Sequence, residues 1–124
     1  MLFGFKRKKK TELTEDQKKW NFLWEKYADG TLEEKYFVLC DYYSGINGGG
    51  HNCFFDNKED DLPKYCELLK QVLPEILFDE FCKAYTAYIE DTNVEEACEA
   101  ADSCFYKNED GLTKILQTYA NSLQ

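Results

Sequence analysis

The chain has 124 residues and a mass of 14.6 kDa, which is enough for one hydrophobic core and too little for two. Hydrophobic residues make up 44% of the sequence, so a fully disordered chain is excluded, and no apolar run is long enough to span a membrane. Five of the 15 basic residues lie at positions 6–10, so the chain from residue 11 onward has a net charge of −14, which excludes the basic surface of an ordinary nucleic-acid binder.

The first part of the chain predicts two amphipathic helices. Thr14 and Gln17 have the spacing of a capping box, and the apolar side chains that follow at helical spacing end at Gly30, which supplies a stop signal. Thr31 and Glu34 repeat the capping box, so a second helix is expected to begin directly after the first.

A glycine-rich segment is expected to break the second helix at residues 44–50, where four of seven residues are glycine. An acidic turn follows at 57–61. Pro63 fits the first turn of a third helix, and Pro74 then interrupts the apolar pattern, so residues 75–90 are expected to form a separate or kinked helix.

Two further helices complete the expected fold. Asn93 and Glu96 have capping-box spacing at the start of one, and the last is expected at about 109–123. No segment shows the alternation of a strand. The sequence therefore predicts an all-α fold, a single compact domain of six or seven short helices over residues 12–124, preceded by a disordered basic tail at 1–11.

The cysteines indicate core packing in a reducing compartment. The six residues form no CxxC pair, and the single histidine offers little for a mixed zinc site. Cys66 and Cys82 fall in apolar series with helical spacing, where a reduced thiol packs as a small hydrophobic side chain. The N-terminus lacks the order of a secretory signal. We therefore expect a cytoplasmic protein with no metal site and no cofactor.

The segment 46–57, INGGGHNCFFDN, is the most unusual part of the chain. A phosphate-binding loop would need a lysine and a serine or threonine after the glycines, and here a histidine and an asparagine follow. Cys53 with His51 would need an orienting group and an oxyanion site to act as a nucleophile pair, so a Cys/His hydrolase is a remote alternative. The structural interpretation is favoured: the glycines permit positive φ and a close approach of two helices, and Phe54 and Phe55 anchor the returning chain in the core.

The same segment resembles the signature of a bacterial family typified by the C-terminal domain of a DNA-mimic protein. That signature reads branched aliphatic, Asn, Asn, Gly, Gly, Phe, any residue, Gln, two aromatics, any residue, Asn. The matching residues are Ile46, Asn47, Gly49, Gly50, Phe54, Phe55 and Asn57. Gly48, His51 and Cys53 depart from it. The resemblance, which covers most of residues 31–123, implies an all-helical, non-enzymatic domain, and for the typifying member a dimer that binds a DNA-binding regulator by presenting DNA-like charge.

Charge mimicry of DNA needs closely spaced carboxylates. Glu95, Glu99 and Asp102 share one face of a predicted helix, with about 6 Å between successive carboxylates. One DNA strand has a charge every ~3.4 Å, so a second acidic row must lie nearby. The candidate partner-binding surface consists of Asp56, Glu59, Asp60, Asp61, Glu90, Asp91, Glu95, Glu99 and Asp102. If these side chains are scattered, they are solvated faces that confer solubility.

These features together predict an acidic, non-enzymatic binding module that occupies the basic nucleic-acid-binding face of a partner, such as a DNA-binding regulator. The alternative is an immunity or antitoxin protein that inhibits a toxin nuclease. Direct binding of nucleic acid is not expected, and a homodimer is left open. Membrane contact through the basic tail is disfavoured because the remaining chain is strongly negative. Gly49 and Gly50 are expected to be structurally necessary.

Overall fold

Six α-helices and one 3₁₀ helix form the protein in a computed structural model that describes residues 12–123. They are α1 (Glu15–Asp29), α2 (Glu34–Asn57), the 3₁₀ helix η2 (Glu59–Asp61), α3 (Leu62–Val72), α4 (Glu75–Glu90), α5 (Val94–Lys107) and α6 (Glu109–Ser122). The predicted all-α fold of six or seven short helices in one compact domain is confirmed. The expectations for residues 1–11 lie outside the described residues. None of the described helices is long and apolar enough to cross a membrane.

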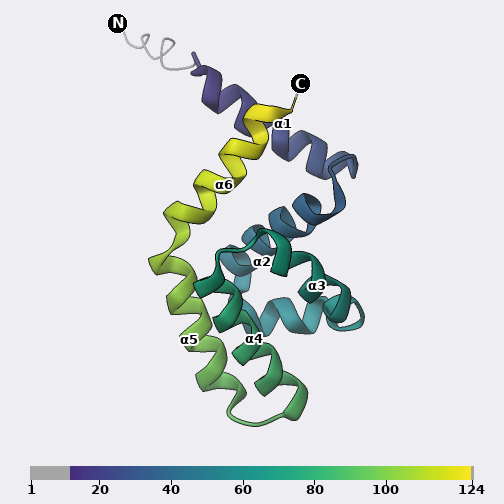
Figure 1. Cartoon of the computed structure of the whole chain (residues 1–124), viewed down its shortest axis with the longest axis vertical. Helices are drawn as coiled ribbons and strands as arrows, with labels where there is room; N and C mark the ends of the chain where they lie inside the picture. Colours follow the sequence, from purple (N-terminus) through teal and green to yellow (C-terminus); the bar gives the residue numbers. More distant parts are fainter. Residues whose placement is uncertain (1–11, 124) are drawn as a thin grey trace, which may run out of the picture.

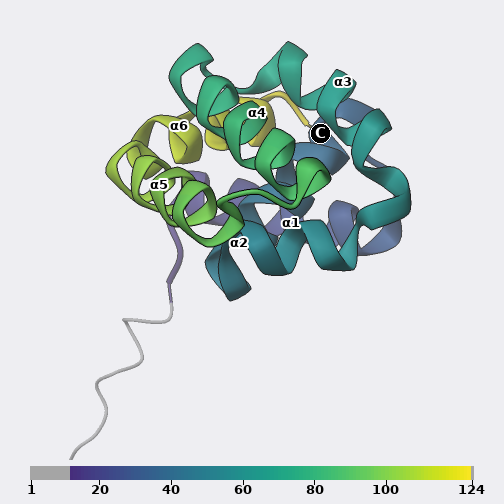
Figure 2. The same ribbon diagram turned by 90° about the horizontal axis from the view of Figure 1, so that it is seen from below.

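Helix α2 is central and packs against α3, α4 and α5, while α1 packs mainly against α6. Helices α1 and α6 lie at one end of the long axis, and the connection between α4 and α5 lies at the other (Figure 1). In the view along that axis, α5 lies on one side of α4 and α3 on the other (Figure 2). The two ends of the molecule are therefore formed by different helices, with α2 between them.

Local signals correctly predict several helix boundaries. Thr14 Oγ1 accepts a hydrogen bond from the backbone N–H of Gln17 at 3.1 Å, and Gln17 Oε1 accepts one from the N–H of Thr14 at 2.8 Å, so the first capping box is confirmed. Gly30 ends α1 with φ 71°. Pro63 lies in the first turn of α3, and α4 begins directly after Pro74. Each of these signals acts within one turn of helix.

The capping box predicted at Thr31 is wrong, whereas the helix start predicted at Asn93 is confirmed without a capping hydrogen bond. Helix α2 begins at Glu34 with Glu33 as its N-cap, later than Thr31, and no side chain caps it. Asn93 is the N-cap of α5 but has φ 53° and ψ 37°, and its side chain makes no capping bond. A capping side chain reaches the first-turn N–H groups from an extended backbone, which Asn93 lacks. The Glu96 carboxylate is therefore left without the capping role predicted for it.

The glycine-rich segment breaks α2 at its last residue only. Residues 44–49 stay helical, and Gly50 then has φ 81° and ψ −179°, after which the helix resumes. Positive φ is thus confirmed for Gly50, whereas the same expectation for Gly49 is wrong. A close approach does occur, because a Cβ at Gly45 would lie 2.7 Å from Phe54 Cδ1. The two parts of α2 therefore pack against each other across the kink.

Aromatic rings fill the centre of the core. Phe54 and Phe55 are both buried, as the structural interpretation expects. Tyr42 packs edge-to-face on Phe81 and on Phe105, each with ring centroids 5.7 Å apart. Such pairs stabilise a core by about 0.5–1.5 kcal/mol beyond the area they bury. Tyr42 lies before the kink, so the first part of α2 is attached to α4 and α5 through rings, and Phe55, after the kink, contacts Phe81 of α4 with ring centroids 5.6 Å apart.

The cysteines are all free thiols. Five of the six are buried or half-buried, as core packing predicts. Cys53 is the exception, because its position in the resumed part of α2 faces solvent.

Replacing Gly50 with alanine is expected to lower the free energy of unfolding by about 2 kcal/mol, because an L-residue at this φ is strained. The added Cβ would also lie 2.7 Å from Asp102 Oδ2. Gly48→Ala is the matched control: a Cβ there meets no atom within 4 Å, and alanine favours the helix. Urea unfolding of both variants checks the prediction, and equal stability of the two would contradict it.

Candidate functional site

His51 follows the kink directly, and its ring is the centre of a buried hydrogen-bond network. The residue is 1% exposed. Its Nδ1 lies 2.7 Å from Asp102 Oδ1, and the same oxygen accepts the backbone N–H of His51 at 2.8 Å. Its Nε2 lies 2.6 Å from Tyr42 Oη. The missing side chain of Gly50 leaves the space that the Asp102 carboxylate occupies.

These partners determine which ring nitrogen carries the proton. Burial raises the pKa of Tyr42 well above its ordinary value of 10.0, so the hydroxyl stays protonated and donates to Nε2 of His51. Nδ1 then carries the proton and donates to Asp102. Burial lowers the pKa of His51 below 6.5, and this effect outweighs the opposing influence of Asp102 and Glu80. The ring is therefore a neutral, structural element.

The same network leaves His51 unable to activate Cys53. Both ring nitrogens of the histidine are engaged, and the ring is buried. The Cys53 side chain is exposed, and its Sγ accepts a hydrogen bond from Asn57 Nδ2 at 3.6 Å. The nucleophile pair on which the hydrolase alternative depends is not formed in this arrangement.

A second carboxylate, that of Asp41, is buried and connects α1, α2 and α3. Tyr27 Oη donates to its Oδ1 at 2.5 Å, Tyr65 Oη donates to its Oδ2 at 2.7 Å, and Lys58 Nζ lies 2.8 Å from Oδ2. Burial by itself raises the pKa of Asp41, but the hydrogen bonds from these three partners lower it below 3.8. Sequence analysis missed this cluster because the tyrosines are 14 and 24 residues away from Asp41, with no local pattern.

Acidic side chains from four helical elements, α2, η2, α4 and α5, lie near the connection between α4 and α5. Tyr88 Oη donates to Asp56 Oδ1 at 2.9 Å, so the end of α2 lies beside the end of α4. The hydrogen bond to Asp56 raises the pKa of Tyr88 to about 12, and the nearby charge of Glu59 adds to this effect. We define the acidic corner as the side chains of Asp56, Glu59, Glu90, Asp91, Glu95, Glu96 and Glu99.

The acidic corner is exposed, and no lysine or arginine among residues 12–123 forms an ion pair with it. All seven of its side chains are exposed, and none takes part in an ion pair among the described residues. The sequence has no lysine or arginine between Lys83 and Lys107. The first turn and a half of α5 also line a surface pocket of about 440 Å³, formed by Asn93, Val94, Glu95, Glu96 and Glu99.

Three residues of the predicted acidic surface lie elsewhere, and one residue is added. Asp102 is engaged by His51. The charge of Asp61 helps to raise the pKa of Tyr65 in α3, and of the three acids of η2 only Glu59 has such an effect on Tyr88, so Asp60 and Asp61 are left out of the acidic corner. Glu96 lines the acidic pocket, although sequence analysis assigned it to a capping box. The signal that could have identified it is the absence of any cation around it in the sequence.

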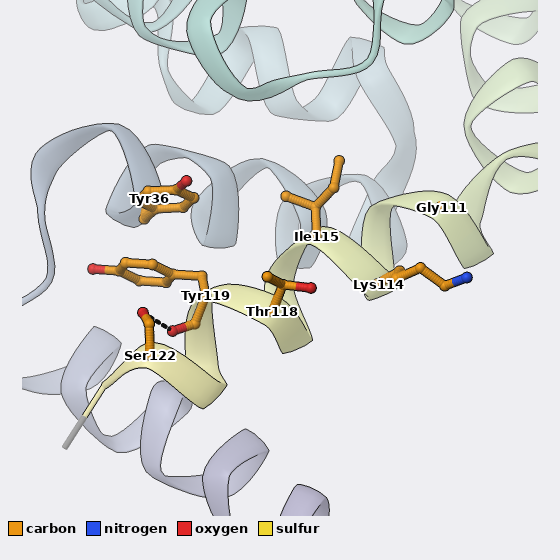
Figure 3. A pocket seen from close by; sticks show the side chains of 7 residues that line it. All are labelled: Tyr36, Gly111, Lys114, Ile115, Thr118, Tyr119 and Ser122. Atoms are coloured by element: carbon orange, nitrogen blue, oxygen red, sulfur yellow. Dashed lines mark hydrogen bonds between the residues drawn. The ribbon is translucent and has the colours of Figure 1, made fainter.

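A separate, mainly apolar pocket of about 440 Å³ lies between the start of α2 and α6 (Figure 3). The rings of Tyr36 and Tyr119 stack there with centroids 3.7 Å apart and planes 10° apart. Tyr119 Oη accepts a hydrogen bond from the backbone N–H of Glu33 at 3.2 Å. Sequence analysis did not identify this pocket, because both tyrosines match the core stripes of their helices. No predicted site residue lines it.

Within residues 12–123, no group of three or more His, Cys, Asp or Glu side chains is arranged to hold a metal ion. Comparisons of the chain with protein-family models, curated proteins and solved structures found no match. The resemblance of residues 46–57 to the DNA-mimic family therefore stays a prediction. In this structure Gly50 forms the kink, and Asn47 Nδ2 donates to the Tyr43 carbonyl oxygen at 2.9 Å.

The stability of the protein is expected to fall as the pH drops below about 6.5. The pKa of His51 is lower in the folded than in the unfolded chain, so the unfolded chain takes up the proton first and is favoured in acid. His51 is the only histidine, so one imidazole signal in NMR reports its titration. A midpoint at or above 6.5 would contradict the neutral, buried ring.

Asp41→Asn is expected to lower the free energy of unfolding by about 2 kcal/mol, because Lys58 loses its charge partner in a largely buried site. Glu34→Gln is the control: it removes an ion pair with Lys64 in which both side chains are more than half exposed, and about 0–1 kcal/mol is expected. Urea unfolding measures both. Since the pKa of Asp41 is lowered by folding, its contribution should disappear below pH 3.8, and a contribution that persists in acid would contradict this account.

Proposed function

We propose that the protein is an acidic, non-enzymatic binding module whose acidic corner binds the basic face of a partner protein. One observation carries the proposal: exposed carboxylates from α2, η2, α4 and α5 lie around one connection without a paired cation among the described residues. Like charges held together in this way attract a basic surface from a distance and accelerate its association.

The composition of the corner supports a protein partner. Ile89, directly before Glu90, is 63% exposed, and Val94 is half-buried in the acidic pocket. An apolar contact surrounded by charge is the usual arrangement of a protein–protein interface. Nucleic acid would be repelled by the same carboxylates.

The acidic corner also supports a partner that itself binds nucleic acid. Carboxylates at Glu95 and Glu99 are about 6 Å apart along α5, which is sparser than the phosphates of one DNA strand. Side chains from the end of α4 and from Asp56 and Glu59 supply charges beyond this single row. We further propose a cytoplasmic location, which the six free thiols support.

Neutralising the corner is expected to abolish partner binding. The corner variant carries Glu95→Gln, Glu96→Gln and Glu99→Gln. The control variant carries Glu12→Gln, Glu25→Gln and Asp29→Asn, three exposed acids outside any described ion pair, so the net charge of the two variants is equal.

Parent protein and both variants are used as baits in the source lysate at low and high salt. Parent and control should capture the same basic protein, and the corner variant should bind it at least tenfold more weakly. The binding should decrease with salt, since screening acts over ~10 Å at 0.1 M, and duplex DNA should displace the partner. Equal capture by the corner variant, or binding that ignores salt, would contradict the proposal.

A second experiment distinguishes a toxin nuclease from a DNA-binding regulator as the partner. An immunity protein would rescue cells from a co-expressed toxin nuclease, whereas a protein that binds a regulator would not. Rescue by the parent and not by the corner variant would show that the acidic corner binds and inhibits the toxin nuclease.

A further inference from the structure

A pocket rich in aromatic rings lies between α1 and α2, away from the acidic corner. Trp20 and Trp24 have ring centroids 5.9 Å apart, and Tyr43 lies 6.2 Å from the first and 6.1 Å from the second. Ser44 and Asn47 complete the lining of a pocket of about 360 Å³. This volume is within the range of small-molecule sites.

The three rings are inclined to one another and not stacked in parallel. The planes of Trp20 and Trp24 are 64° apart, and those of Trp20 and Tyr43 are 84° apart. The rings are half-buried, so each also keeps surface in contact with solvent. Ring faces of different orientation are thus available around a single pocket.

Two oxygen acceptors lie at the polar side of this pocket. Asn47 uses its Nδ2 to donate to the Tyr43 carbonyl oxygen, which leaves its Oδ1 for another donor. Among residues 12–123, the Ser44 hydroxyl has no hydrogen-bond partner. Both residues are exposed. A ligand that fits the pocket would therefore combine an apolar body with a group that donates hydrogen bonds.

The sign of the charge on that ligand follows from electrostatics. The face of an indole ring carries negative potential and attracts cations. The chain from residue 11 onward has a net charge of −14, which repels anions and concentrates cations near the surface. A neutral apolar ligand would gain no hydrogen bond from the two oxygen acceptors. An organic cation is attracted by the ring faces and by the negative net charge, and it can donate hydrogen bonds to the two oxygen acceptors.

We propose that this pocket binds the ammonium head of a small alkylamine. The ammonium lies at the ring faces of Trp20, Trp24 and Tyr43, its N–H groups donate to Ser44 Oγ and Asn47 Oδ1, and the alkyl part fills the apolar remainder of the pocket. The site is independent of the acidic corner and of the function proposed for it.

Intrinsic fluorescence provides a direct test, because the chain has only two tryptophans and both line the pocket. Butylammonium chloride is expected to change the fluorescence in a saturable way with a millimolar dissociation constant. Butanol has the same alkyl group without the charge and should bind at least tenfold more weakly. Sodium chloride at equal ionic strength should give no saturable change.

Two variants identify the groups that bind. Tyr43→Leu removes a ring face and should weaken butylammonium binding at least fivefold. Ser44→Ala changes an exposed residue, should preserve the urea unfolding midpoint, and should weaken binding about threefold. Equal binding of butanol, an absence of saturation, or unchanged affinity in a folded Ser44→Ala variant would each overturn the proposal.

Discussion

The structure depends on the turn of α2 at Gly50 and on the carboxylate of Asp102 that fills the space beside it. The kink directs the backbone N–H and the ring Nδ1 of His51 onto Oδ1 of Asp102, which lies in α5. Any Cβ at Gly50 would compete with the Asp102 carboxylate for space, and most closely with its Oδ2. The same turn carries Phe54 and Phe55 into the core and brings the end of α2 beside Tyr88. The geometry of the acidic corner therefore follows from a constraint at a single glycine.

Asp41 is buried and Asp102 is half-buried, and both carboxylates connect helices through hydrogen bonds. Asp41 is stabilised by two tyrosine hydroxyls and the ammonium of Lys58, and Asp102 by two N–H groups of His51. A carboxylate removed from water is tolerated only when donors replace its hydration, and such networks then favour one packing arrangement. Because these two acids are used for structure, the partner binding that we propose is left to other, exposed acids.

Both proposed binding surfaces select positive charge, but by different physics. The acidic corner acts through exposed charges, so its attraction is long-ranged and weakened by salt. The pocket of Trp20, Trp24 and Tyr43 acts through ring faces and two oxygen acceptors at van der Waals distance, where shape and desolvation matter more than ionic strength. A partner surface and a small cation can therefore be bound at separate places on one acidic protein.

The sequence by itself determined the helices, most of their ends and the excess of negative charge, because signals such as the Thr14 capping box, Gly30 and Pro74 act on neighbours within a turn or two. It misplaced the break of α2 and the start of that helix, and it placed the start of α5 correctly at Asn93, where the backbone is not extended and the side chain therefore makes no capping hydrogen bond. Only the tertiary structure decided which acids are buried, that His51 is a structural group, and that Glu96 belongs to the acidic corner. The physical reason is that these outcomes depend on contacts between distant residues, such as the 51 positions that separate His51 from Asp102.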